Sequence, residues 1–301
     1  MEATTQHISV CICTYKRQQM LQHLLEVLDR QETDGQFIYS IVVADNDAAQ
    51  SAKAVVHRFR ESSRTSIIYC VEPVQNIALA RNKAVENAKG DFVAFIDDDE
   101  FPIARWLLTL FSVCIEYKVD GVLGPVKPHF GQEAPQWVIK GKFYDRPTYP
   151  TGLVIDWSKG RTGNVLLRKR LFTYDQQPFR PEFRTGEDQD FFGRMIEKGH
   201  IFIWCDEAVA YEWVPPIRWK RRFILKRTLF RGSLSLLDKT FGVRDIAKSI
   251  IAIPLYTATL PFALVCGHHR FMGCLVKLSY HVGRILAVLG INPIGDAYVT
   301  E

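Results

Sequence analysis

The stretch that most constrains the fold of this chain is a short apolar run that ends in four carboxylates. Residues 92–96 read Phe-Val-Ala-Phe-Ile, and Asp-Asp-Asp-Glu follows at 97–100. A run without polar residues is typical of a strand covered on both faces, as in a parallel sheet. Open α/β sheets bind ligands just beyond the carboxyl ends of their strands. The stretch therefore predicts a buried strand with an acidic site at its end.

The spacing of these carboxylates indicates a divalent cation. In an extended chain Asp97 and Asp99 share one side, and Asp98 faces away. Neighbouring carboxylates repel each other unless a positive group lies between them. Mg²⁺ or Mn²⁺, which also bind phosphate oxygens, are the natural partners of such a group. The alternative is an acidic turn that caps a following helix, which Pro102 is able to open.

Strand and helix patterns alternate before and after this stretch. Apolar strand patterns occupy 8–13, 38–44, 65–71, 92–96 and 121–126, and helical spacing occupies 20–28, 52–59, 79–88 and 103–117. This alternation predicts a Rossmann-like α/β sheet flanked by helices. Residues 132–157 are rich in Pro, Gly and aromatic residues without periodicity, so we expect loops there.

Charged groups end three of the expected strands: Lys16 with Arg17, Asp45 with Asp47, and Asp97 with Asp99. Such endings on one sheet edge suggest a ligand with phosphates and a heterocycle or a sugar. The chain has neither GxGxxG after its first strand nor GxxxxGK[ST], which argues against a dinucleotide fold and a P-loop kinase. Arg81 falls early in a helix, where phosphate is favoured, although an exposed surface arginine is the alternative.

The cysteines and the amino-terminal residues favour the cytoplasm. Seven cysteines at irregular spacing form no CxxC pair, which favours free thiols in a reducing compartment. The first seven residues have no basic region and no apolar core, so they do not read as a secretory signal. The net charge of +5 does not by itself imply nucleic acid, and no segment resembles a module that reads it.

A late basic segment predicts contact with a membrane. Residues 218–231 carry seven basic residues and no acidic ones, interleaved with large apolar side chains. A basic amphipathic helix is expected to lie on an anionic membrane surface. A solvated charged face and nucleic-acid binding are the alternatives.

Two apolar segments follow. Residues 247–266 are almost wholly apolar and long enough to just span a bilayer. Pro254 and Pro261 interrupt them, so a re-entrant or interfacial element is an equal alternative. Residues 271–289 carry Lys277, His281 and Arg284 at a spacing that shares one face, which suits a surface-bound amphipathic helix.

These segments together resemble the family 2 glycosyltransferases with the GT-A fold. The matching segments are Ser-Val-Cys-Ile-Cys-Thr-Tyr-Lys-Arg at 9–17, Val-Val-Ala-Asp-Asn-Asp at 42–47, Asn-Ile-Ala-Leu-Ala-Arg-Asn at 76–82 and Phe-Ile-Asp-Asp-Asp at 95–99. Gly-Glu-Asp-Gln-Asp at 186–190 matches the family's catalytic motif. The resemblance implies a GT-A Rossmann-like mixed sheet flanked by helices. It is greatest for the glucosyltransferases of succinoglycan-type exopolysaccharide biosynthesis.

The resemblance also implies roles for individual residues. Asp188 is the expected general base, although acidic capping of the helix start is the alternative. Asp97 and Asp99 are the expected ligands of Mn²⁺ or Mg²⁺. Glu212 stands about where many members have a histidine ligand, a weaker assignment. The expected substrate-binding residues are Thr14, Tyr15, Arg17, Asp45, Asn76, Arg81, Asp98, Asn164 and Glu187.

The implied reaction is the inverting transfer of a hexose, glucose first, from a UDP-sugar to a lipid-diphosphate-linked saccharide. Residues 1–125 are expected to bind the nucleotide sugar, residues 126–235 the acceptor, and residues 236–301 the cytoplasmic face of the inner membrane, with other polysaccharide-assembly enzymes as further partners. No Gln-x-x-Arg-Trp occurs, which favours one sugar per acceptor. The alternatives are a lipopolysaccharide or other cell-envelope glycosyltransferase and a non-catalytic scaffold that binds nucleotide sugars.

Overall fold

A computed structural model describes residues 5–131, 133–173, 177–183, 185–237 and 241–291. The chain divides into two compact units. The first, called the sheet unit, comprises Met1–Pro128 and Arg146–Trp213. The second, called the helical unit, comprises His129–Asp145 and Val214–Glu301.

The sheet unit is built on a seven-stranded mixed sheet with the strand order β3-β2-β1-β4-β8-β6-β9. β1 pairs in parallel with β2 and β4, whereas β8 runs antiparallel to β4 and β6. This confirms the expected mixed α/β sheet. The strands are β1 (Gln6–Thr14), β2 (Phe37–Asp45), β3 (Ser66–Val71), β4 (Phe92–Ile96), β6 (Gly121–Leu123), β8 (Asn164–Arg168) and β9 (Phe202–Trp204).

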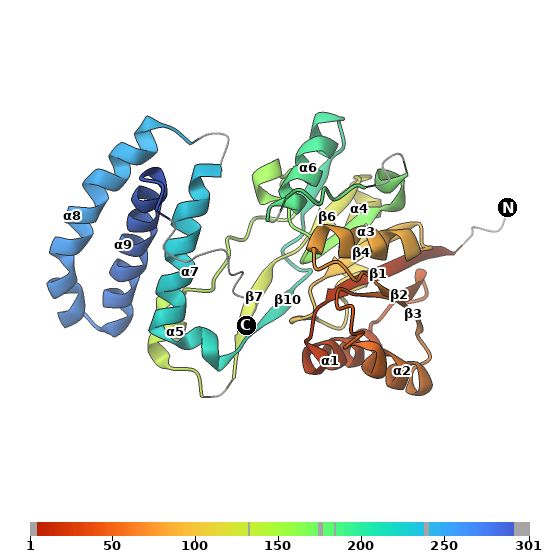
Figure 1. The fold of residues 1–301 in the computed structure, drawn as a ribbon. Coiled ribbons are helices and arrows are strands. Elements are labelled where there is room, and N and C mark those ends of the chain that lie inside the picture. The colour runs from red at the N-terminus through yellow and green to blue at the C-terminus, as the bar shows by residue number, and fades with distance from the viewer. Residues whose placement is uncertain (1–4, 132, 174–176, 184, 238–240, 292–301) are drawn as a thin grey trace. The chain divides into compact units, whose positions relative to one another are not determined.

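Helices cover both faces of this sheet (Figure 1). Side chains alternate along a strand, so Val10 of β1 packs with the core on one face and Cys11 with the core on the other. Leucines at helical spacing give α1 the apolar stripe that the sheet buries. The helices are α1 (Gln18–Leu28), α2 (Lys53–Ser62) and α4 (Trp106–Glu116) on the first face, and α3 (Ile77–Asn87) and α6 (Glu187–Glu197) on the second.

A second sheet of three strands, in the order β5-β10-β7, corrects two expectations. Pro102 does not open a helix, because β5 (Glu100–Pro102) pairs antiparallel with β10 (Ala210–Val214) and α4 begins only at Trp106. The strand expected at 121–126 is two strands, because the chain leaves the large sheet after β6 and starts β7 (Val126–Phe130) in the small one. Gly-Pro at 124–125 separates them, and a proline removes a ladder donor.

The segment expected to consist of loops holds some helix. α5 (Gln136–Gly141) forms within it, with Val138 fully buried. Short 3₁₀ turns occur at Trp157–Lys159, Lys169–Phe172, Pro216–Trp219 and Ser235–Leu237.

The helical unit consists mainly of α5, α7 (Arg221–Leu234), α8 (Val243–Val265) and α9 (His268–Val288), which lie beside one another in Figure 1. The basic helix starts at Arg221, because Pro216–Trp219 forms a 3₁₀ turn instead. α8 continues through Pro254 and Pro261. By length and composition, α8 and α9 are each able to cross a membrane, and little of either is buried within the protein.

α7 and α9 approach each other through glycines. A Cβ at Gly232 of α7 would collide with the carbonyl oxygen of Tyr280, and a Cβ at Gly283 of α9 with that of Leu229. Each glycine thus lets the backbone of the other helix come into contact, which any larger residue would prevent. A small core of Val138, Tyr144, Val214 and Ile224 completes the helical unit.

Candidate active site

The acidic residues after β4 form a turn, in which the amide of Glu100 donates to the carbonyl of Asp97 at 3.0 Å. The expectation that Asp98 faces away from Asp99 assumed an extended chain and is wrong. One nitrogen of Arg17 lies 2.9 Å from Asp98 Oδ1 and 3.2 Å from Asp99 Oδ2. Arg17 therefore bridges these two carboxylates, whereas Asp97 lies 3.9 Å from Arg81.

Asp98 ties the acidic turn to the loop after β1. It is 4% exposed, and its Oδ2 accepts from the hydroxyl of Thr14 at 2.7 Å. Burial raises the pKa of this carboxyl to about 6, against the opposite effect of Arg17. Thr14 and Asp98 thus hold the site together. Their predicted contacts with substrate, and that of Tyr15 beside them, stay predictions.

Glu100 and Glu212 lie directly opposite each other in the antiparallel pair of β5 and β10. They are 2% and 8% exposed. Burial, with Asp97 as the next cause, raises the pKa of Glu100 well above its usual value. Arg146 donates to Glu212 Oε2 and lies 3.9 Å from Glu100 Oε1. The ladder therefore gathers two glutamates and an arginine beside the acidic turn.

The carboxylates around Glu100 fit a hard divalent cation. Glu100 Oε1 is buried and has no hydrogen-bond partner. A Cβ at Gly163 would lie 2.9 Å from that oxygen and 3.1 Å from Asp97 Oδ2, so the glycine leaves space beside both. Carboxylate oxygens are the ligands that Mn²⁺ and Mg²⁺ prefer. Within the described residues, no three His, Cys, Asp or Glu side chains already stand in metal-binding geometry.

A buried ion pair joins the acidic turn to the start of α6. Arg81 of α3 donates to Glu187 of α6, and these residues are 7% and 5% exposed. The same guanidinium lies 3.9 Å from Asp97 Oδ1. Burial raises the pKa of Glu187, against the opposite effect of Arg81. Arg81 therefore fixes Asp97 and the predicted catalytic motif relative to each other.

Asp188 stands at the first turn of α6 and is partly exposed. Its Oδ1 accepts a hydrogen bond from the backbone amide of Gln189 at 2.8 Å. Asp190, by contrast, pairs with Arg194 at 2.8 Å and lies 3.6 Å from Arg180. Asp190 is therefore held in an ion-pair network, whereas the carboxylate of Asp188 stays available at the candidate active site. Its role as base stays a prediction.

Three predicted substrate-binding residues have roles within the fold. Asp45 is fully buried and accepts from the hydroxyl of Tyr69 at 2.8 Å. Asn76 caps α3 by accepting from two backbone amides. Asn164 is 2% exposed and accepts from the indole of Trp106 at 2.7 Å. Their contacts with a donor stay predictions.

Besides Glu100, the structure brings forward three residues that were not among the predicted site residues. Asp47 follows β2, and its Oδ2 is buried without a hydrogen-bond partner. Arg146 and Arg161 line one small pocket together with Gly163 and Asn164. Asp47 was noted only as a strand-end carboxylate. Arg146 lies in the segment without periodicity and Arg161 shortly after it, so neither arginine gave a signal of its own.

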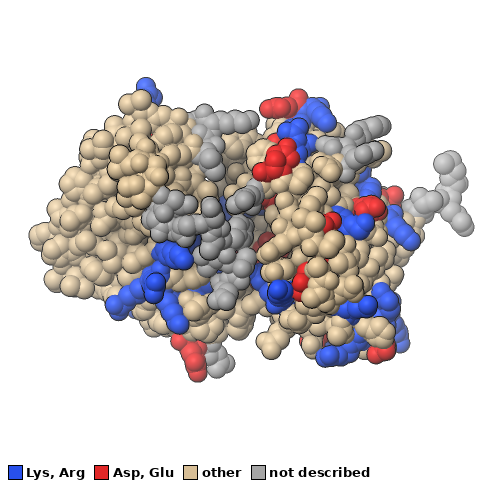
Figure 2. Space-filling model, in the orientation of Figure 1, with Lys and Arg blue, Asp and Glu red and all other residues tan. Residues whose placement is uncertain are grey.

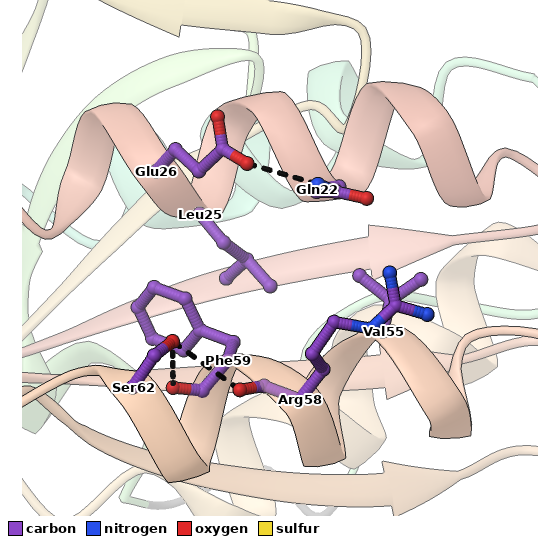
Figure 3. A pocket seen from close by; sticks show the side chains of 7 residues that line it. All are labelled: Gln22, Leu25, Glu26, Val55, Arg58, Phe59 and Ser62. Atoms are coloured by element: carbon purple, nitrogen blue, oxygen red, sulfur yellow. Dashed lines mark hydrogen bonds between the residues drawn. The ribbon is translucent and has the colours of Figure 1, made fainter.

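Another hollow lies between α1 and α2 (Figure 3). Its walls include Leu25, Val55 and Phe59, and Gln22 donates to Glu26 at 3.0 Å on its rim. None of the predicted site residues lines it. The candidate site is therefore the acidic turn with Glu187 and Asp188.

Comparison with known proteins gives a consistent result. The family model described as Glycosyl transferase family 2 matches residues 9–173. The chain is 32% identical to "Succinoglycan biosynthesis protein ExoM" of Rhizobium meliloti (strain 1021), over 98% of this chain and 96% of that protein. It is 28% identical to "Glycosyltransferase AglE" of Haloferax volcanii, over 70% of this chain and 68% of the relative.

Solved structures share the fold. A mannosyltransferase from Pyrobaculum calidifontis, in complex with GDP-Man and Mn²⁺, aligns with a TM-score of 0.64 at 15% identity, over 96% of this chain and 89% of that one. S. aureus TarS 1–349, in complex with UDP-GlcNAc, aligns with a TM-score of 0.53 at 15% identity, over 95% and 93%.

Proposed function

Since the chain belongs to glycosyl transferase family 2, we propose that it transfers a hexose, glucose first, from a UDP-sugar to a lipid-diphosphate-linked oligosaccharide, with inversion. The relative that this chain matches over 96% of its length is named a succinoglycan biosynthesis protein, and we assign this chain to the synthesis of a similar exopolysaccharide. The observation that carries the proposal is the junction at Arg81, which joins the acidic turn to the helix of Asp188. Residues 1–125 serve mainly the donor, and residues 126–235 serve the acceptor and supply the catalytic carboxylate.

The chemistry follows from these positions. A sugar hydroxyl is a poor nucleophile, so a carboxylate must take its proton as it attacks the anomeric carbon. Asp188 takes that proton. A single base opposite the leaving group gives direct displacement and inverts the anomeric centre. Asp97 and Asp99, with Glu212 as a weaker third ligand, would hold Mn²⁺ or Mg²⁺, which when bound would neutralise the charge that develops on the departing diphosphate.

A donor-release assay tests the proposal. The full-length chain is incubated with UDP-glucose, UDP-galactose, UDP-GlcNAc and GDP-mannose, with Mn²⁺, Mg²⁺ or EDTA, and the released nucleotide is counted. We expect metal-dependent release from one UDP-hexose, lowered about a hundredfold by EDTA or by Asp97→Asn. Asp34→Asn, an exposed carboxylate paired with Arg105, is the matched control.

The assay also separates the alternatives. Release from GDP-mannose would show that the donor is not a UDP-sugar. An unchanged rate in EDTA would show that the reaction needs no divalent metal. If no donor is turned over even after a membrane extract supplies the lipid acceptor, the chain is a binding scaffold.

We further propose that the helical unit binds an anionic lipid surface. Ile251, Leu255, Phe262 and Val265 of α8 are 67%, 58%, 75% and 90% exposed. Their spacing places them on one face of the helix, and Figure 2 shows the surface over α8 almost free of charged side chains. α7 adds basic residues and has no acidic ones. Apolar insertion together with basic attraction is the pattern of an interfacial anchor.

Flotation with phosphatidylcholine vesicles, with and without phosphatidylglycerol, tests this anchor. We expect the double variant Ile251→Asp/Phe262→Asp to lose most of its association, because charged groups are costly to bury in lipid. Ile38→Asp, at an exposed apolar position of the sheet unit, should float like the wild type. Equal flotation of all three proteins would contradict the anchor.

A further inference from the structure

Arg146 contacts Glu212, the weaker ligand that the proposed function assigns to the divalent cation, and the neighbouring carboxylate of Glu100. It donates to Glu212 and lies 3.9 Å from Glu100 Oε1. Burial opposes its charge, but Glu212, Glu100, Asp97 and Asp99 outweigh that effect and raise its pKa. Arg146 is thus a cation placed among the same groups that would bind a metal.

The pairing of β5 and β10 explains why a cation is needed there without a metal. Glu100 and Glu212 face each other across an antiparallel pair, and like charges directly opposite destabilise a sheet. Both side chains are buried, so water screens their repulsion poorly. A guanidinium between them supplies the missing positive charge.

The contact of Arg146 with Glu100 is nevertheless incomplete. At 3.9 Å it is an ion pair without a hydrogen bond, and Glu100 Oε1 stays without a donor. The space beside that oxygen, where Gly163 has no side chain, also borders Asp97 Oδ2. A divalent cation in this space would face Glu100, and its charge would make Arg146 superfluous. The two cations therefore compete for one set of carboxylates.

A second arginine, Arg161, indicates which group Arg146 would pair with once a metal has displaced it. Arg161 lines the same pocket, and among the described residues it makes no ion pair. Although Arg161 is exposed overall, desolvation of its guanidinium and then the charge of Arg146 lower its pKa, so the two guanidiniums repel each other. An anion between them would relieve that repulsion, and paired arginines suit the oxygens of a diphosphate.

We propose that Arg146 is a built-in counter-ion that neutralises Glu100 and Glu212 until a divalent cation and the donor diphosphate bind, and that it then pairs with the diphosphate beside Arg161. The inference rests on the proposed function. It makes binding of the cation and of the nucleotide mutually dependent, because each takes one partner of the same ion pair.

Mn²⁺ binding tests the exchange without an activity readout. The detergent-solubilised full-length chain is titrated with Mn²⁺ at neutral pH, with and without UDP, and free Mn²⁺ is measured by electron paramagnetic resonance. Without UDP, we expect Arg146→Gln to bind Mn²⁺ about tenfold more tightly than the wild type. The reason is that Mn²⁺ no longer has to displace the charged hydrogen bond of Arg146, and such a bond corresponds to a factor of about ten in affinity. The gain in affinity that UDP brings should shrink by a similar factor.

Two further variants serve as controls. Arg146→Lys keeps the positive charge and should bind Mn²⁺ like the wild type. Arg105→Gln, which removes an exposed arginine paired with Glu32 and Asp34, should do so as well. Equal or weaker Mn²⁺ affinity of Arg146→Gln overturns the role of Arg146, and metal-dependent donor release by the wild type leaves the proposed function standing. If no variant binds Mn²⁺ and no donor is turned over, both fail.

Discussion

Asp188→Asn is expected to lower the rate of sugar transfer about a thousandfold, because an amide cannot accept the proton of the acceptor hydroxyl. The loss should fall on the rate of transfer, with little change in donor affinity, since Asp188 acts on the acceptor. Its structural role is small, because its hydrogen bond is to its own neighbour Gln189 at the helix start. The measurement is single-turnover transfer from the donor identified by the release assay.

Two comparisons make this result specific. Asp34→Asn removes an exposed carboxylate elsewhere in the sheet unit and should keep the wild-type rate. Thermal unfolding should show that Asp188→Asn folds, with at most about 1 kcal/mol lost from the helix start. A variant that keeps more than about a tenth of the wild-type rate would assign the base elsewhere.

Arg81→Met is expected to cost about 3–5 kcal/mol of folding free energy, the usual result of removing one partner from a buried ion pair. Glu187 would keep its place in the interior without a cation, because both residues are almost fully buried. Urea denaturation measures the loss. We also expect transfer to fall, since Arg81 lies 3.9 Å from Asp97.

The double variant Arg81→Met/Glu187→Met separates the contribution of the ion pair to stability from that of side-chain packing. It removes both charges, so its stability should return toward the wild type and lie well above the sum of the single losses. Transfer should stay impaired, because Asp97 and the start of α6 lose their common partner. Strictly additive losses would show that the two residues contribute independently.

Local patterns predicted strands β1 to β4 and the helices between them. β4 occupies the predicted range 92–96, because burial on both faces leaves a continuous apolar run in the sequence. α6 begins at Glu187, in agreement with the helix start that was considered at Asp188. Proline was less informative, since Pro102 lies in a strand and α8 continues through Pro254 and Pro261.

The contacts of the site were harder to predict because they join distant parts of the chain. Arg17 bridges Asp98 and Asp99 only because residues 97–100 turn, which the apolar run before them does not encode. Glu100 meets Glu212 through strand register, and Arg146 reaches both from an irregular segment. The strand-end carboxylates indicated the candidate site, but only the fold showed which charges neutralise them.

The glycine contact between α7 and α9 has a consequence for the environment of the helical unit. Backbone contact at Gly232 and Gly283 depends on close van der Waals packing, whereas the hydrophobic effect requires water. Transfer of the unit from an aqueous medium to a lipid one therefore leaves this attraction largely intact. The pair can keep one geometry on both sides of the membrane–water boundary, so that attachment to a bilayer requires no refolding of these two helices.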